Sequence, residues 1–386
     1  MVMIRRIQFG LSTVLLAVLA ACGGGDDTPT IAAKVPVTSL RVMGDSLADV
    51  GTFGIKFTIQ GNDTYPERVS TAYNLGKGCN FFAFDGTTFA ANTAAKNCTN
   101  YAIGGAVINP TASGYAAADP RGLAVQFAAA TAAGNYGAGD LLLVDGGGND
   151  AAALVGAYLA AATDSGASYL ALLGTLLTPA QVTAAASGGA TGLAAAGSTY
   201  MSALADSFYN TMKTSALDKG AQRIALLNMP GITNTPRFQM VLDSIAAASG
   251  GGTAGATARA QSEALFNSWT VAFNSRLAAN VAGNSKVVLV DFYTAFNNQI
   301  ANPATYGLTN VKTPACPIAG VGTDKLPSYT FATCTDATLA ATTPPAGGTA
   351  DWYKTYAFSD GFHPTPAGHQ LLATEITKAL TAAGWL

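Results

Sequence analysis

Two short stretches at opposite ends of this 386-residue chain carry side chains that could work together as a nucleophile and its base. Ser46 directly follows Gly44 and Asp45 at the end of an apolar run, and a glycine there permits a sharp turn that exposes the serine hydroxyl. A serine hydroxyl is a poor nucleophile until a base removes its proton. The sequence contains two histidines, His363 and His369, so the base must come from the C-terminal stretch.

That C-terminal stretch, FSDGFHPTPAGHQLLA, supplies both a base and a carboxylate to orient it. Asp360 precedes His363 by three residues, so on a tight loop its carboxylate can accept the Nδ1 proton and leave Nε2 facing a serine. Ser46, His363 and Asp360 therefore predict nucleophilic catalysis. His369 is expected in or near the first turn of the following helix with a structural role, because such a triad needs no second base.

Acyl transfer also needs hydrogen-bond donors for the oxyanion, and two glycine-rich stretches could provide them. In NYAIGGA, which begins at Asn100, paired glycines allow a backbone N–H to approach a substrate. In VDGGGND, Asn149 can donate its side-chain amide. Each stretch taken alone is also explained as the ordinary turn between a strand and a helix.

The elements that must position these residues follow from the hydrophobic pattern. Helical patterns separate the expected strands, the clearest of them beginning at Glu263, so we expect an α/β fold with a mostly parallel, doubly wound sheet. Ligands of such sheets bind beyond the carboxyl ends of the strands, where Ser46 would lie. Insertions are expected near residues 55–99 and 151–200, and a loop over residues 246–260. The four apolar runs that predict buried strands are residues 39–43 and the runs that begin at Asp140, Arg223 and Lys286.

Composition excludes several classes of protein. Hydrophobic residues make up 49% of the chain and charged residues 11%, which is typical of a compact protein with a sizeable core. The formal charge is −2 and no basic patch stands out, so nucleic acid and anionic lipid are not expected partners. Two histidines and no clustered cysteines leave a metal ion too few ligands. The sequence indicates no oligomeric state.

The N-terminal residues show the pattern of an export signal. Arg5 and Arg6 precede an apolar stretch over residues 7–19, and Leu-Ala-Ala-Cys ends at Cys22, a pattern that resembles a bacterial lipobox. We therefore expect a lipoprotein signal peptide over residues 1–21, a lipidated Cys22 and a flexible tether over residues 22–38. The protein would then be exported and anchored to the outer membrane through this lipid alone. The alternative is an ordinary signal peptide with an incidental cysteine and an extracellular protein.

Cysteine usage agrees with export. Lipidation of one of the five cysteines would leave an even number, and an oxidising compartment favours disulfides. Three connectivities are possible, and the simplest joins Cys79 to Cys98 and Cys316 to Cys334. Each of these disulfides would close a local loop and stabilise the fold by about 3 kcal/mol. The sequence contains no C-x-x-C motif, so neither a zinc site nor a redox motif is expected. The remaining cysteines are Cys79, Cys98, Cys316 and Cys334.

Four stretches together resemble the GDSL (SGNH) hydrolases, in that family's order and at the expected places, and the resemblance extends over most of residues 39–386. It implies a three-layer α/β/α, flavodoxin-like fold and a serine esterase or lipase of the longer bacterial and plant branch, acting without a cofactor. Ala48 and Val50 stand where that branch often has serine and a polar residue, a departure that puts no catalytic group in doubt. The matching positions are Gly44-Asp45-Ser46-Leu47, Gly105, Gly147 with Asn149, and Asp360-x-x-His363.

The resemblance also implies individual roles. Ser46 would be the nucleophile, His363 the base and Asp360 its orienting acid, with an oxyanion hole formed by Ser46, Gly105 and Asn149. The α/β-hydrolase fold, which shares the order Ser, Asp, His, fits poorly because no G-x-S-x-G occurs.

Two questions stay open at this level. The chain could be a catalytically inactive surface lipoprotein that binds glycan or lipid. Within the hydrolases it could be a phospholipase, a polysaccharide deacetylase or a polyester hydrolase, and the apolar character of residues 151–180 favours a hydrophobic ester.

Overall fold

The computed structural model describes residues 35–132, 134–345 and 347–386, and a sheet of parallel strands runs through it. Neighbouring strands pair in parallel, with Val42 opposite Leu143 and Leu226 opposite Leu289. The strands follow the chain order across the sheet and coincide with the four apolar runs of the sequence. They are β1 (Ser39–Met43), β4 (Asp140–Val144), β5 (Ile224–Leu227) and β6 (Val287–Val290).

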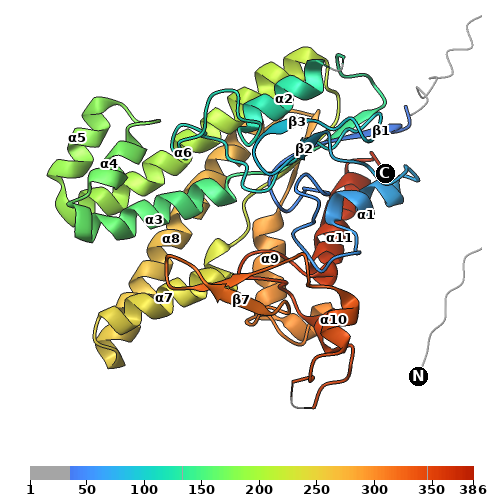
Figure 1. The fold of residues 1–386 in the computed structure, drawn as a ribbon. Coiled ribbons are helices and arrows are strands. Elements are labelled where there is room, and N and C mark those ends of the chain that lie inside the picture. Colours follow the sequence, from blue (N-terminus) through green and yellow to red (C-terminus); the bar gives the residue numbers. More distant parts are fainter. Residues whose placement is uncertain (1–34, 133, 346) are drawn as a thin grey trace, which may run out of the picture. The chain divides into compact units, whose positions relative to one another are not determined.

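Helices cover both faces of this sheet because alternate residues of each strand point to opposite sides. Leu142 and Val144 of β4 belong to one hydrophobic core, whereas Leu141 and Leu143 belong to another. The expected three-layer α/β/α arrangement is therefore present (Figure 1). One core is completed by α2 (Leu123–Ala132), α3 (Gly148–Asp164), α6 (Gly189–Ser215) and α8 (Gly252–Val281), the other by α1 (Tyr65–Ala72), α9 (Phe292–Ala301) and α11 (Pro366–Ala382).

The segment expected as an insertion near residues 151–200 is helical. Alanine is the strongest helix former, and this segment is rich in it. Thr178 and Gln181 cap each other's backbone at the start of a short helix there, which fixes where that helix begins. The additional helices of this region are α4 (Ala167–Leu173) and α5 (Pro179–Ser187).

The prediction of a loop over residues 246–260 is wrong for most of its length. The helix α7 (Pro236–Ala248) continues into this run, and α8 begins at Gly252, so only residues 249–251 separate the two helices. The alanines favour helix, and the glycines let the two helices approach closely. A Cβ at Gly255 would lie 2.5 Å from the backbone oxygen of Ala246.

The close packing of α6 on α8 gives a stability prediction. A Cβ on Gly197 would lie 2.1 Å from Cε2 of Trp269, whose indole nitrogen is fixed by donating to the Ala194 oxygen. We expect Gly197→Ala to lower the free energy of unfolding by about 1–3 kcal/mol, because the buried ring must move. Gly156→Ala, in helix α3 with no atom within 4 Å of the new Cβ, should raise it by about 0.5–1 kcal/mol. Urea unfolding of both variants checks the opposite signs, and equal effects would contradict this packing.

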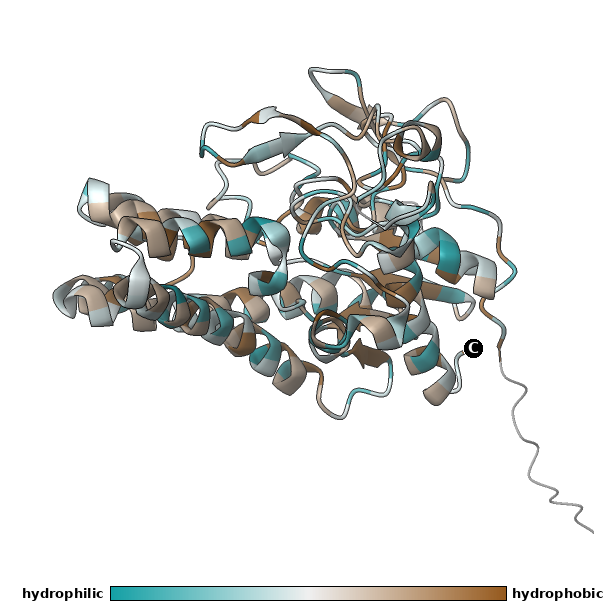
Figure 2. Cartoon of the chain, turned by 90° about the horizontal axis from the view of Figure 1, so that it is seen from below, coloured by the Kyte–Doolittle hydropathy of each residue, from teal (hydrophilic) through white to brown (hydrophobic). Residues whose placement is uncertain are grey.

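The remaining elements lie outside the sheet. Figure 2 shows that the helices carry both hydrophobic and hydrophilic residues. The smaller elements are β2 (Phe82–Phe84), β3 (Phe89–Ala91), β7 (Ile318–Val321), β8 (Pro327–Tyr329), α10 (Asp336–Ala340) and the 3₁₀ turns Leu217–Lys219, Ile232–Asn234, Pro303–Tyr306 and Trp352–Thr355.

Two disulfides are present, Cys79–Cys98 and Cys316–Cys334, which are the two local pairs. The predicted signal peptide, Cys22 and all but the last few residues of the tether lie outside the described residues. None of the helices in the described ranges combines the length and the hydrophobicity that crossing a bilayer requires.

Candidate active site

Ser46 lies in the turn that leaves β1, and its hydroxyl opens into a cavity of about 190 Å³. The turn is tight because the Asp45 carboxylate accepts the N–H of Leu47 at 3.0 Å. Neither the Ser46 N–H nor the Gly105 N–H donates to another residue within the described ranges, so both are free to bind a ligand in that cavity.

A buried network holds the two residues that precede this serine. Gln126 accepts from the Gly44 N–H at 2.9 Å and donates to the Gly44 oxygen at 3.0 Å, which fixes that peptide from both sides. The Asp145 carboxylate accepts the Asp45 N–H at 2.9 Å and the Tyr65 hydroxyl at 2.6 Å. Any Cβ at Gly44 would lie 2.1 Å from Asp145 Oδ1, so the glycine is required by close approach.

His363 and Asp360 meet Ser46 from the other end of the chain. The Nε2 atom of His363 lies 2.6 Å from Ser46 Oγ, and its Nδ1 lies 2.9 Å from both carboxylate oxygens of Asp360. The same carboxylate accepts the backbone N–H groups of Phe362 and His363 at 2.8 and 2.7 Å. This short loop therefore presents the imidazole with one nitrogen toward the carboxylate and the other toward the serine, as the Asp-x-x-His spacing predicts.

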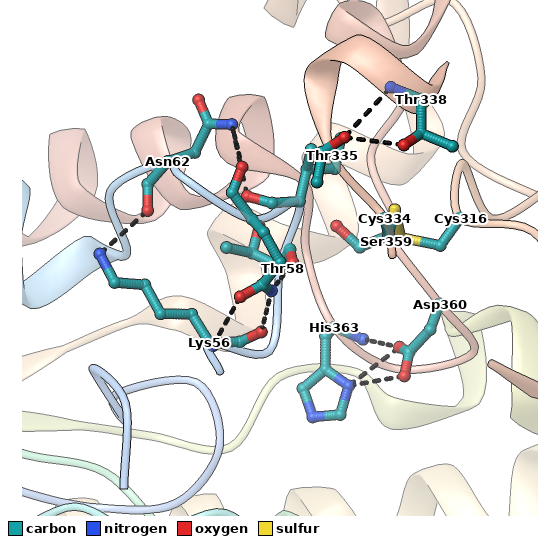
Figure 3. Close-up of a disulfide and its surroundings, with 12 residues drawn as sticks. Lys56, Thr58, Asn62, Cys316, Cys334, Thr335, Thr338, Ser359, Asp360 and His363 are labelled. Carbon is teal, nitrogen blue, oxygen red and sulfur yellow. Dashed lines mark hydrogen bonds and ion pairs between the residues drawn. A yellow bond between two sulfur atoms is a disulfide. The ribbon is translucent and has the colours of Figure 1, made fainter. Parts of the chain in front are cut away.

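Both disulfides brace segments that lead to the site. Figure 3 shows the Cys316–Cys334 bridge beside the segment that carries Ser359 and Asp360. The Cys316 N–H donates to the Ser359 oxygen at 2.8 Å, so the bridge is coupled to the loop that orients the imidazole. The Cys79 oxygen likewise accepts from the N–H of Asn100, at the start of the stretch that leads to Gly105.

Charges around the imidazole favour its cationic form. Burial lowers the pKa of His363, but the charge and hydrogen bond of Asp360, with a further contribution from Asp45, raise it above its ordinary value of 6.5. Burial raises the pKa of Asp360, but His363 and the two backbone donors lower it below 3.8 overall. Asp360 is therefore ionised at neutral pH. An imidazolium that forms beside it is stabilised.

The pKa of the buried Asp145 carboxyl group is shifted in the opposite direction to that of Asp360. Burial, with the nearby charge of Asp45 added, raises the pKa of Asp145 to about 8. The pKa of Asp45 is also raised by burial, although the Leu47 N–H and His363 partly offset this. Two carboxyl groups in one buried space cannot both ionise easily, which is why the pKa of Asp145 is raised.

The two stretches proposed to supply oxyanion donors reach the same cavity as Ser46. Gly105 and Asn149 both line it, and the Asn149 amide donates to the Ala106 oxygen at 2.9 Å. The carboxylate of Asp150 accepts the N–H groups of Ile108 and Asn109 at 2.9 Å each, which ties the glycine stretch to the start of α3. An amide nitrogen carries two hydrogens, so Asn149 keeps one for a ligand.

His369 has a separate place. It lies in the first turn of α11, fully buried, and its Nδ1 accepts the Tyr65 N–H at 3.2 Å. Burial lowers its pKa to about 3, so it is neutral at physiological pH. The structural role predicted for it agrees with this position.

The sequence matches a known protein family over most of its length. A family model described as GDSL-like lipase/acylhydrolase matches residues 40–376. The chain belongs to this family. It is also 27% identical over 158 residues to a GDSL esterase/lipase of Arabidopsis thaliana, an alignment that covers 41% of this chain and 38% of the plant protein. The chain therefore matches less than half of the plant relative's length, and membership of the GDSL family indicates a hydrolase.

Several residues of this GDSL site carry no role in the sequence interpretation. Asp145, Tyr65 and Gln126 come from three separate elements, so spacing along the chain does not connect them. The sequence does single out Asp145 in one way, because a carboxyl group directly after a fully buried strand lies at the end of the sheet where Ser46 is expected. Within the described ranges, no group of three or more histidine, cysteine, aspartate or glutamate side chains is arranged to hold a metal ion.

Proposed function

We propose that the protein is a serine carboxylester hydrolase, an esterase or lipase, that works through an acyl-enzyme. The observation that carries the proposal is the 2.6 Å separation of His363 Nε2 and Ser46 Oγ, with Asp360 on the other imidazole nitrogen. In this reaction His363 takes the proton as Ser46 Oγ attacks the ester carbonyl, and it then protonates the departing alcohol. A water molecule deprotonated by His363 releases the acid and regenerates Ser46.

The charges of the site support this cycle. The imidazole must gain a proton in each attack and lose it in each departure, and Asp360 stabilises the cation between the two steps. The negative charge on the former carbonyl oxygen would meet the free N–H groups of Ser46 and Gly105 and the second amide hydrogen of Asn149.

Asn149 gives a test of the oxyanion hole. We expect Asn149→Ala to lower kcat by about 10²–10³-fold with a small change in KM, because the lost donor acts on charge that develops only in the transition state. Steady-state kinetics on 4-nitrophenyl butyrate measures both constants. The matched control is Asn298→Ala on the exposed surface of α9, which should leave them unchanged. A rise in KM at constant kcat would instead indicate a ground-state contact.

Labelling with a fluorophosphonate probe tests the proposed function itself. The Ser46 oxygen would displace fluoride from phosphorus, so intact-protein and peptide mass spectrometry should locate one adduct on Ser46. His363→Ala should prevent labelling, whereas Ser244→Ala on α7 should not affect it. A folded wild-type protein that does not label would be a binding protein without catalysis, and the proposal would fail.

The walls of the cavity favour a hydrophobic, uncharged ester. Phe57, Ile232, Phe238 and Phe362 line it, and among the described residues no lysine or arginine does. A phosphate group would therefore lack a cationic partner, which favours a carboxylester over a phospholipid headgroup.

We also propose export and lipid anchoring at Cys22. The basic and apolar pattern before this cysteine supports it, as does the presence of two disulfides, which persist in oxidising compartments. Growth with a radiolabelled fatty acid should label the wild-type chain and not Cys22→Ser.

A further inference from the structure

A second, smaller cavity adjoins the one that holds Ser46. Its volume is about 50 Å³, and the two cavities share four lining residues, Leu47, Pro230, Thr235 and Phe362. Leu47 follows Ser46 in the sequence and Phe362 precedes His363. The residues that the two cavities share therefore lie beside the proposed nucleophile and base.

The second cavity is apolar and carries no charge. Its walls come from α9, α11 and the segment around residues 357–364, and in the described part of the chain none of its lining residues is Asp, Glu, Lys, Arg or His. Two of the lining side chains can form hydrogen bonds, Thr235 and Gln299. The Thr235 hydroxyl already donates to the Ile232 oxygen at 2.8 Å, which leaves the amide of Gln299.

Gln299 is buried without a partner. The residue has 5% of its surface exposed, and within the described ranges its Nε2 atom has no hydrogen-bond partner. Its cavity neighbours on α9, Phe292 and Phe296, are apolar, so a leucine would suit the site better as packing. An unpaired buried amide destabilises a fold. This unpartnered amide belongs to a residue that lines the second cavity, so a ligand held there could accept its hydrogen bond.

We propose that this cavity is a subsite for the acyl arm of the ester, and that it selects hydroxyacyl esters, whose hydroxyl oxygen accepts a hydrogen bond from Gln299. The proposal rests on the proposed function. The apolar walls suit methylene groups, and a neutral donor suits a neutral oxygen. A terminal carboxylate would be buried without a cation and is rejected. Because about 50 Å³ holds only a few heavy atoms, the subsite takes the end of the arm, and the rest lies in the larger cavity.

Kinetics on paired substrates tests the selection. The pairs are 4-nitrophenyl esters of unsubstituted and ω-hydroxylated acids of four to ten carbons, with the half-ester of suberic acid as the charged analogue. At one chain length the wild type should prefer the hydroxylated ester, and Gln299→Leu should lower that preference in kcat/KM about tenfold. Activity on the unsubstituted esters should persist. Asn298→Leu, the neighbouring exposed amide, should leave the preference unchanged.

Stability and binding provide readouts that do not depend on hydrolysis. Gln299→Leu should raise the Tm of the free protein, because the unpaired amide is gone, whereas a structural amide would make the Tm fall. Calorimetry on Ser46→Ala should show tighter binding of methyl 8-hydroxyoctanoate than of methyl octanoate, or the same for the pair of the preferred length. Adding Gln299→Leu should remove the difference.

These results separate the two proposals. If no ester is hydrolysed but Ser46→Ala still binds the hydroxylated ester better in a Gln299-dependent way, the subsite stands and the proposed function fails. If esters are hydrolysed with no Gln299-dependent preference, the subsite proposal is overturned, and a Tm that falls in Gln299→Leu would then assign the amide a structural role.

Discussion

Ser46→Ala is expected to lower kcat for a short-chain nitrophenyl ester by about 10⁵–10⁶-fold while leaving the protein folded. The alanine removes the attacking oxygen, and the remaining rate would come from water bound in a site that still holds donors for an oxyanion. Folding should survive because the Oγ atom forms a hydrogen bond with His363, whereas the turn is held through Gly44 and Asp45. Initial rates at saturating substrate, with circular dichroism and Tm beside them, check both statements.

A double mutant sharpens this prediction. If Ser46 and His363 act as one unit, Ser46→Ala combined with His363→Ala should be no slower than either single variant, because the second loss removes nothing further. Ser244→Ala, an exposed serine on α7, serves as the matched control and should keep full activity. Additive losses, or retention of activity in folded Ser46→Ala, would show that another group attacks the ester.

The strands and the main site residues could be predicted because their signals are local. β4 is buried over its whole length, so it appears in the sequence as an uninterrupted apolar run. The spacing of Asp360 and His363 places both on one tight loop, so their contact needs no knowledge of the fold. Ser46 could be joined to them only through the expected sheet and the GDSL resemblance, since 317 positions separate it from His363.

The supporting contacts could not be predicted because they join distant elements through side chains of ordinary types. Gln126 holds Gly44 from α2 across 82 positions, and nothing in its own surroundings distinguishes it from another helical glutamine. The helix α8 was missed at its start for a different reason. The glycines that follow Ala246 are poor helix formers, so by propensity they predict a loop. In the structure Gly255 is helical, and a small residue is needed there because the backbone of Ala246 packs against it.

Asp360→Asn is the second variant with a large expected effect, because it changes the proton on the imidazole while preserving the loop. The asparagine oxygen can still accept the backbone N–H groups of Phe362 and His363. Its NH₂ group would replace one of the two oxygens that lie 2.9 Å from Nδ1, which favours the imidazole with its hydrogen on Nε2, a form that donates to Ser46 instead of accepting from it. We expect kcat to fall about 10⁴-fold, the size of this exchange in other serine hydrolases, with little change in KM or Tm.

The pH profile distinguishes this cause from simple loss of structure. In the wild type the neutral imidazole is the active base, so kcat/KM should rise with pH through the pKa of His363, which lies above 6.5. Asp360→Asn removes the main charge that raises this pKa and leaves burial, which lowers it, against the smaller contribution of Asp45, so the acidic limb of the residual activity should move to lower pH. Asp243→Asn on the exposed surface of α7 should leave the limb in place. An acidic limb that stays at the wild-type pH in Asp360→Asn would mean that a group other than His363 is the base. The Asp360 carboxylate contacts the His363 imidazole, whereas His369 accepts from the Tyr65 N–H, so the exchange should change the pKa of His363 above all.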